Sequence, residues 1–241
     1  MDIYYKSVRS NNIPASTLKD VLDIEEKFFE FSGDLLLASI LNRNELYTFY
    51  CKKTKKLIGT VSVKWILDGD NVIIYVGNAA VEPEFQRHNL LGLVTYLSYF
   101  KTIWRYPMKN IYFAAFFATP KSYNVTKKNQ FRFPRKDYIC TDENKRLMKL
   151  VADIIAGPGH YEDHKDYILM TVYNKNHFVK SLAADVASSH DGYFETLNPD
   201  YASGKQLLTI FKVDLQTFIT GQKSIVKFIY NKINLGLIYR I

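Results

Sequence analysis

The chain has 241 residues, of which 47% are hydrophobic and 23% are charged, and it contains 18 tyrosines and 16 phenylalanines. Disordered and low-complexity chains lack aromatic residues, so this composition excludes them and predicts one large globular unit. Its 32 basic and 24 acidic residues leave a net charge of +8. That excess favours an anionic ligand such as a polyphosphate, but it is also common in proteins that bind none.

Neither a membrane span nor a secretory leader is expected. The longest uninterrupted apolar run, Ile111 to Ala118, is far shorter than the roughly 18 residues of a membrane-spanning helix. Met1 to Lys6 contains neither a basic n-region nor an apolar h-region. Only Cys51 and Cys140 occur, which gives no disulfide framework and no metal-ligand spacing. We therefore expect a cytoplasmic protein, with export by a non-classical route left open.

The first half of the chain predicts strands and helices in a definite order. Aromatic and β-branched runs between turn residues predict strands over 3–8, 46–52, 57–67, 72–81 and 111–118. Apolar spacing predicts a helix after Pro14, with Ser16 and Thr17 as cap candidates and an end near Ser32-Gly33. Further helices are predicted over 35–41 and from about Gln86 to just before Pro107. A helix joins the last two of these strands. Strand, helix and strand in this order form a βαβ crossover, so we expect those two strands to be parallel neighbours.

The second half is predicted to continue with a helix over 142–156, which Thr141 caps and Gly157-Pro158 ends. A strand over 167–173 and a helix over 178–186 follow. The segments 193–197 and 207–213 resemble a final strand pair, and 216–241 has helical spacing with lysines along one side.

The connection from Val81 to Leu91 is the most informative stretch, because it joins a buried strand to a helix. A helix start offers unpaired backbone N–H groups and the positive end of the helix dipole, which suit a phosphate or pyrophosphate. Arg87 and His88 add side-chain donors beside it. The alternative interpretation is an ordinary connection that carries a solvated basic residue.

The strand order from Ile3 to about Ala118, together with Val81-x-Pro83-x-x-Gln86-Arg87-His88, resembles the GNAT (GCN5-related N-acetyltransferase) superfamily, as a divergent member. The match covers about half of the chain. Gln86 occupies the first position of the acetyl-CoA motif, usually written Gln/Arg-x-x-Gly-x-Gly/Ala. Asn89 and Leu91 stand where the family prefers a glycine and a small residue; asparagine tolerates unusual backbone angles, whereas the Leu91 side chain would crowd a pyrophosphate.

The resemblance implies an α/β fold of the α+β type, with a mixed central sheet flanked by helices and parallel fourth and fifth strands that splay apart. It places the pantetheine arm of acetyl-CoA, or of another acyl-CoA, between those strands as co-substrate, with no metal. The implied binding residues are Ala80, Val81, Gln86, Arg87, His88, Asn89, Leu90, Leu91 and Thr119.

Acyl transfer to an amine requires a base for the nucleophile and a proton or screening for the leaving thiolate. The fourth strand, 73–80, contains no carboxylate, so Glu82 at its end is the nearest candidate base. The resemblance implies Tyr123 as the partner of the thiolate. Each also has a purely structural interpretation, as a solvated loop residue for Glu82 and as a half-buried residue capping the sheet for Tyr123.

Two further patterns are weaker. His160 and His164 form a His-x-x-x-His pair near acidic residues, but the preceding Gly-Pro-Gly favours a solvated loop over a zinc site. Aromatic and basic residues interleave from Tyr123 to Lys136 and could bind nucleic acid by stacking, cover CoA phosphates or form a solvated loop. The balance of these patterns disfavours nucleic acid as a partner.

We therefore expect one GNAT-like domain over 1–241, with an insertion at about 138–191 and a C-terminal helical tail at about 214–241. The expected function is an acyl-CoA-dependent N-acyltransferase in which a primary amine attacks the thioester directly. The acceptor, a small molecule or a protein, is not readable from the sequence. The alternative is a catalytically inactive GNAT-fold binding or regulatory module, which Leu91 and the carboxylate-free fourth strand favour.

Overall fold

The structure is a computed structural model, and it describes residues 3–30, 33–124, 132–171, 178–179 and 192–213. The strands are β1 Ile3–Arg9, β2 Phe29–Glu30, β3 Glu45–Cys51, β4 Leu57–Asp68, β5 Asn71–Val81, β6 Asn110–Phe117, β7 Tyr161–Asp163, β8 Ile168–Met170, β9 Phe178–Val179 and β10 Gln206–Val213. The α-helices are α1 Ala15–Glu25, α2 Gly33–Leu41, α3 Leu90–Arg105, α4 Pro120–Asn124, α5 Asp142–Ile155 and α6 Tyr193–Leu197. Short 3₁₀ helices span Ser10–Asn12, Pro83–His88 and Tyr201–Ser203.

Eight strands form one sheet in the order β1-β3-β4-β5-β6-β10-β8-β7. All neighbouring pairs are antiparallel except β5 and β6, which are parallel, as the crossover through α3 requires. The predicted parallel pair is therefore confirmed. Strands β7 and β8 come from the predicted insertion and extend the sheet beyond β10.

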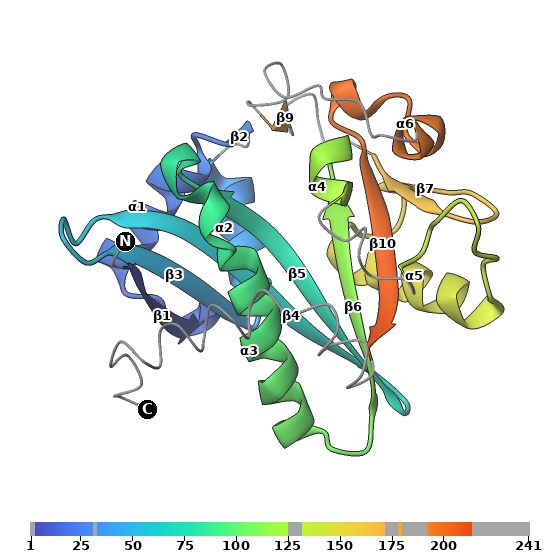
Figure 1. Cartoon of the computed structure of the whole chain (residues 1–241), viewed down its shortest axis with the longest axis horizontal. Helices are drawn as coiled ribbons and strands as arrows, with labels where there is room; N and C mark the ends of the chain where they lie inside the picture. The colour runs from blue at the N-terminus through green and yellow to red at the C-terminus, as the bar shows by residue number, and fades with distance from the viewer. Residues whose placement is uncertain (1–2, 31–32, 125–131, 172–177, 180–191, 214–241) are drawn as a thin grey trace.

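Alternation along the strands separates the two faces of the sheet. Val72 and Ile74 pack beneath α3, whereas Ile73 and Tyr75 face α5. Helices α1 and α2 cover the α5 face over β3 and β4, where Leu46 joins their apolar cluster. Figure 1 shows α3 in front of the sheet, with α1 and α2 on its opposite side and α5 near the β10 edge.

Several boundaries differ from the sequence prediction. Helix α1 ends at Glu25, because Phe29–Glu30 instead pairs with Phe178–Val179 as a separate two-stranded sheet. That pairing also makes 178–179 a strand rather than the start of a helix. The segment 193–197 is helix α6, not a strand; its Phe194 is fully buried against Tyr123, and β10 pairs with β6 and β8 instead.

Other predictions hold or fall outside the described residues. Thr141 caps α5 by accepting a hydrogen bond of 3.1 Å from the Asn144 amide. The helix predicted from about Gln86 starts at Leu90, after a 3₁₀ turn. The predicted helical tail, 214–241, and residues 180–186 lie outside the described residues. Within the described chain, no helix is both long enough and apolar enough to cross a bilayer.

Replacing a fully buried leucine tests this packing. Leu147 of α5 has no exposed surface, so Leu147→Ala removes buried methyl groups and leaves a cavity. We expect a loss of about 2–5 kcal/mol in the free energy of unfolding, measured by urea denaturation. The control is Leu41→Ala, since the Leu41 side chain is 47% exposed. Equal losses for the two variants would contradict the assignment of α5 to the core.

Candidate functional site

Strands β5 and β6 separate part-way along their length. Their parallel pairing begins at Asn71–Asn110 and ends at Tyr75–Ala114, yet β5 continues to Val81 and β6 to Phe117. Each strand keeps its outer partner, because Val81 pairs with Gly59 of β4 and Phe117 with Leu207 of β10. Among the described residues, the second half of β5 thus has no strand partner on its β6 side. Figure 1 shows the two strands meeting at one end and separating at the other.

A β-bulge begins just beyond the last shared pair. Val63 pairs with Val76, and Val61 pairs with Ala79, so Gly77 and Asn78 together oppose the single residue Ser62. A bulge of this kind bends the strand and increases its twist. It therefore turns the end of β5 away from β6, and Ala79, three residues beyond the bulge's start at Val76, is exposed.

The start of α3 lies next in the chain after the end of β5. Asn89 precedes the helix with φ 54° and ψ 37°, the left-handed conformation that favours glycine, and its side chain makes no capping hydrogen bond. The Leu93 amide donates a hydrogen bond of 3.0 Å to the Asn89 carbonyl. A Cβ on Gly92 would overlap the Asn89 amide, so Gly92 leaves room for that side chain. The helix start thus presents backbone donors suited to an anion.

The other predicted phosphate-side residues surround this helix start. Gln86 donates a hydrogen bond of 3.1 Å from Nε2 to the Val81 carbonyl, which ties the 3₁₀ turn to the end of β5. The His88 ring lies 6.4 Å from that of Phe85. Leu90 is buried, and Leu91 packs against the core beneath α3. Leu91 is therefore held partly by the sheet rather than standing free at the helix start.

Glu82 continues the β4 pairing beyond the end of β5, since its amide donates to the Ile58 carbonyl at 3.0 Å. Its carboxylate accepts a hydrogen bond of 2.5 Å from Lys27, in a pair whose lysine side chain is 58% exposed. Ala80, two residues earlier, is fully buried. The structure thus places Glu82 at the same end of β5 as the predicted binding residues, but already engaged with a lysine.

Thr119 and Ser122 form a reciprocal hydrogen-bonded pair at the start of α4. The Ser122 amide donates to Thr119 Oγ1 at 3.1 Å, and the Thr119 amide donates to Ser122 Oγ at 3.2 Å. This capping arrangement fixes the helix directly after β6. Both residues are half-buried.

Tyr123, in the same helix, is only 1% exposed. Its hydroxyl donates a hydrogen bond of 2.8 Å to the Pro134 carbonyl. The Arg132 guanidinium lies 3.8 Å from the centre of its ring and donates to its backbone carbonyl at 2.8 Å. In this structure the hydroxyl predicted to meet the thiolate is therefore buried and already donating.

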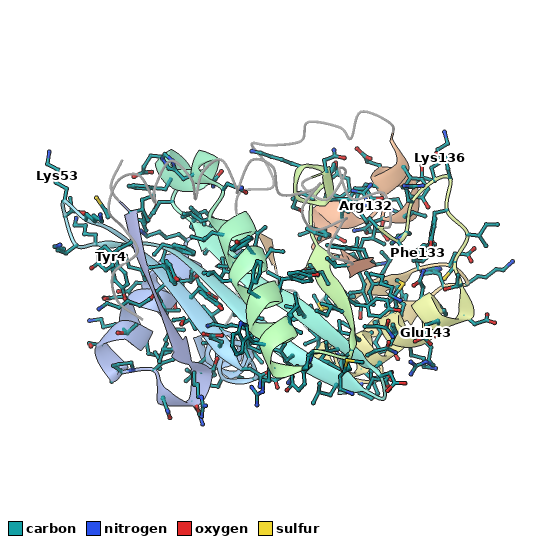
Figure 2. The ribbon with its side chains drawn as sticks, turned by 60° about the horizontal axis from the view of Figure 1, so that its bottom comes forward. Tyr4, Lys53, Arg132, Phe133, Lys136 and Glu143 are labelled. Carbon is teal, nitrogen blue, oxygen red and sulfur yellow. The ribbon has the colours of Figure 1, made fainter. Side chains whose placement is uncertain are left out.

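The aromatic and basic segment that follows is not an exposed stacking surface in its described part. Arg132 and Phe133 are 5% and 2% exposed, and Phe133 exchanges backbone hydrogen bonds with Ile210. Figure 2 shows Lys136 projecting outward, whereas Arg132 and Phe133 lie among the packed side chains. The nucleic-acid interpretation of Arg132 and Phe133 is therefore wrong, because both pack against the core; residues 125–131 lie outside the described residues.

Glu25, at the last position of α1, is a fully buried carboxyl group beside the bulge. Its two oxygens accept hydrogen bonds from Thr60 Oγ1 at 3.0 Å and from Asn78 Nδ2 at 3.1 Å. Asn78 also donates to Ser39 Oγ at 2.7 Å. Burial raises the pKa of Glu25 to about 7, against the smaller lowering effects of Asn78, Thr60 and Arg43. A carboxyl group that titrates near neutral pH suits general-base chemistry.

Glu25 was not among the functional residues predicted from the sequence. The signal was present, because Glu25 occupies a position on the apolar stripe of α1, where a charged residue is rarely buried without a reason. His160 and His164, by contrast, belong to no cluster of three or more metal-ligating side chains within the described residues. His164 instead stacks on Tyr167 and lies 3.3 Å from Glu162.

The strand order, the single parallel pair and its separation beside α3 are the arrangement that the resemblance predicted. The described residues have the GNAT-type fold. No family model and no curated protein matches the sequence. Three solved structures with similar backbones are the Arabidopsis thaliana protein NAA60 with a bisubstrate analogue, the Escherichia coli ribosomal-protein-S18-alanine N-acetyltransferase, and the NatC complex bound to Gag peptide and CoA.

The NAA60 match has 10% identity and a TM-score of 0.46, and it covers 88% of this chain and 100% of the other. The E. coli enzyme has 9% identity and a TM-score of 0.40, and the match covers 88% of this chain and 96% of that enzyme. The NatC match has 14% identity and a TM-score of 0.40, and it covers 89% of this chain and 100% of the other. These values are low, so the fold assignment rests on the strand order and register described above.

The pH dependence of stability tests the environment of Glu25. Its folded-state pKa is raised from 4.5 to about 7, so the folded protein binds more protons than the unfolded chain between these values. Stability therefore falls as pH rises from 4.5 to about 7. Glu25→Gln removes this titration, and we expect its free energy of unfolding, relative to wild type, to rise over that window by on the order of 3 kcal/mol. Parallel pH profiles for the two proteins would contradict the assignment.

Proposed function

We propose that the protein is an acyl-CoA-dependent N-acyltransferase that transfers an acetyl group to a primary amine. The observation that carries the proposal is the separation of β5 from β6 beyond Tyr75–Ala114, next to the uncapped start of α3. Unpaired strand backbone can hydrogen-bond the amide groups of a pantetheine arm. The helix start can hold the pyrophosphate that such an arm carries.

The binding residues follow from this placement. Ala80 and Val81 contribute backbone groups, while Gln86, Arg87, His88, Asn89, Leu90 and Leu91 border the pyrophosphate and Thr119 borders the thioester end. The left-handed Asn89 allows the turn into α3 that the family makes with glycine. No metal is needed, because direct aminolysis of a thioester requires only proton transfer and charge stabilisation.

In the proposed reaction, the amine loses a proton to a base, and its lone pair forms a C–N bond to the thioester carbonyl. The C–S bond then breaks, the electron pair leaves with sulfur, and the thiolate takes up a proton. Glu82, expected as the base from the sequence, lies beyond the bulge and binds Lys27. Glu25 lies at the bulge and titrates near pH 7, so we assign the base to Glu25 and keep Glu82 as the alternative.

A second function, acyl-CoA binding without catalysis, is favoured by one observation. The Tyr123 hydroxyl is buried and donates to the Pro134 carbonyl, so it can protonate a thiolate only if that bond breaks. Release of free thiol from acetyl-CoA over a panel of amine acceptors separates the two functions. Turnover above the uncatalysed rate supports the enzyme, and saturable CoA binding with no turnover supports the binding module.

Calorimetric titration with acetyl-CoA and desulfo-CoA at fixed, moderate salt tests the binding site. We expect saturable one-to-one binding of both. Ala79→Trp places an indole on the exposed part of β5 beyond the bulge, so it should weaken binding by about tenfold or more. Ser7→Trp, on exposed edge strand β1, is the matched control and should leave the affinity unchanged. Absence of binding, or equal effects of the two tryptophans, would overturn the proposed site.

The choice between the two carboxylates is tested by kinetics once an acceptor is found. With Glu25 as base, the rate rises as pH increases through about 7 and then levels off. Glu25→Gln should lower kcat by about 100-fold or more and remove that rise, while acetyl-CoA binding is retained. Glu82→Gln, which removes only the pair with Lys27, should have a small effect. The reverse pattern would assign the base to Glu82.

A further inference from the structure

Arg43 is a buried cation, and two of its three guanidinium nitrogens have no hydrogen-bond acceptor among the described residues. It lies in the turn between α2 and β3 and is 8% exposed. Its Nε and Nη1 atoms are buried and meet no acceptor among the residues that the structure describes. Arginine stays charged inside proteins and offers five N–H donors, so burying it unsatisfied is costly. A cost of this size suggests that the guanidinium serves a ligand.

The surroundings of Arg43 are built around its side chain. The guanidinium carbon lies 5.0 Å from the centre of the Tyr75 ring, and that ring is in turn 6.2 Å from Phe116 of β6. A Cβ on Gly77 would lie 2.8 Å from Arg43 Nε and 2.7 Å from Ser62 Oγ, so only glycine leaves space there. Ser62 Oγ is also buried without a partner in the described chain. Stacking on Tyr75 stabilises the charge but accepts none of its hydrogen bonds.

The local charges favour an anion at this position. Lys64 is a second cation near Arg43; its pKa is lowered mainly by burial and further by the Arg43 charge. The charge of Arg43 lowers the pKa of the Glu25 carboxyl group slightly, but no described carboxylate lies within ion-pair distance of the guanidinium. With a pKa of about 7, Glu25 is only partly ionised near neutral pH and is mostly neutral well below it. The balance of nearby charge is therefore positive.

Arg43 also stands where the two central strands part. Tyr75 is the last β5 residue paired with β6, and Gly77 opens the bulge. Arg43 shares this part of the sheet with Glu25 and Asn78, on the face opposite α3. Under the proposed function the thioester meets its acceptor here, so an anion held by Arg43 belongs to the acceptor rather than to the CoA phosphates at α3.

We propose that the acceptor is an amine that carries a carboxylate close to its nitrogen, and that Arg43, assisted by Ser62, binds this carboxylate. The inference rests on the proposed function. A planar guanidinium matches a carboxylate with two parallel N–H···O bonds, which positions as well as attracts it. A free amino acid and an acidic residue at a peptide terminus both supply this chemistry.

Product-like probes test the inference without requiring turnover. CoA is titrated first; if it does not bind, the proposed function fails and the acceptor question does not arise. With CoA saturating, three probes are titrated: N-acetylglycine, the α-amide of N-acetylaspartic acid, and N-acetylglycinamide, which lacks a carboxylate. We expect one or both carboxylates to bind at least about tenfold more tightly than the neutral amide. The better of the two identifies a free amino acid or an acidic peptide terminus as the source.

Variants locate the effect at Arg43. Arg43→Met should abolish the preference for the carboxylates, and Arg43→Lys should keep part of it. Arg146→Met is the control, because Arg146 is a surface residue paired with Glu143 and Asp68. Without ligand, Arg43→Met should raise the melting temperature by roughly 2–4 °C, since it removes an unsatisfied buried charge. Equal binding of carboxylates and amide to wild type, or a preference unchanged in Arg43→Met, would overturn the inference.

Discussion

The organisation of the site depends on one constraint on hydrogen bonding between strands. β5 cannot pair with β6 beyond Tyr75, because the bulge at Gly77 and Asn78 bends it while β4 holds its other edge in register to Val81. β6 is likewise held by β10 to its last residue. Both strands are fixed from outside and separated from each other. Backbone groups that a continuous sheet would use internally thus become available for a ligand.

The same bulge also gathers the polar residues of the opposite face. In a regular strand only one residue would oppose Ser62, whereas here both Gly77 and Asn78 do. Gly77 lies against Ser62 and Arg43, and Asn78 donates a hydrogen bond to Glu25. The result is a carboxyl group that titrates near neutral pH beside an arginine that no described carboxylate neutralises. Burial disfavours the charged form of Glu25, and the unpartnered N–H groups of Arg43 cost stability. Buried polar groups that weaken a protein are typical of binding and catalytic sites, where the stability loss accompanies function.

The elements with clear local sequence patterns were predicted correctly. The β3–β4 hairpin, the crossover through α3 and the Thr141 cap were read correctly, because each depends on local patterns. The end of α1 was predicted wrongly because β2 pairs with a segment about 150 residues away. The helix at 193–197 was predicted as a strand, and its Phe194 packs against Tyr123, which is distant in the sequence. No local pattern encodes such pairings.

The candidate site shows the same division. The motif predicted a helix after β5 but placed its start near Gln86, whereas α3 begins at Leu90 after a 3₁₀ turn; the left-handed Asn89 accounts for the missing glycine. Glu25 was interpreted only as part of a helix face, and nothing in the sequence singled out Arg43; the folded sheet brings both to the bulge. Tyr123 was placed correctly after β6, but the partner of its hydroxyl comes from a later segment. Chemistry that depends on neighbours distant in sequence could not be read from one chain.

Hydrogen–deuterium exchange with and without CoA tests the central claim most directly, since it reports on individual stretches of backbone. The account predicts that CoA slows exchange within residues 76–81 of β5 and at the first amides of α3, and leaves edge strand β1 unchanged. Protection elsewhere in the chain, with none in these two segments, would contradict the claim that the separated end of β5 is a binding surface.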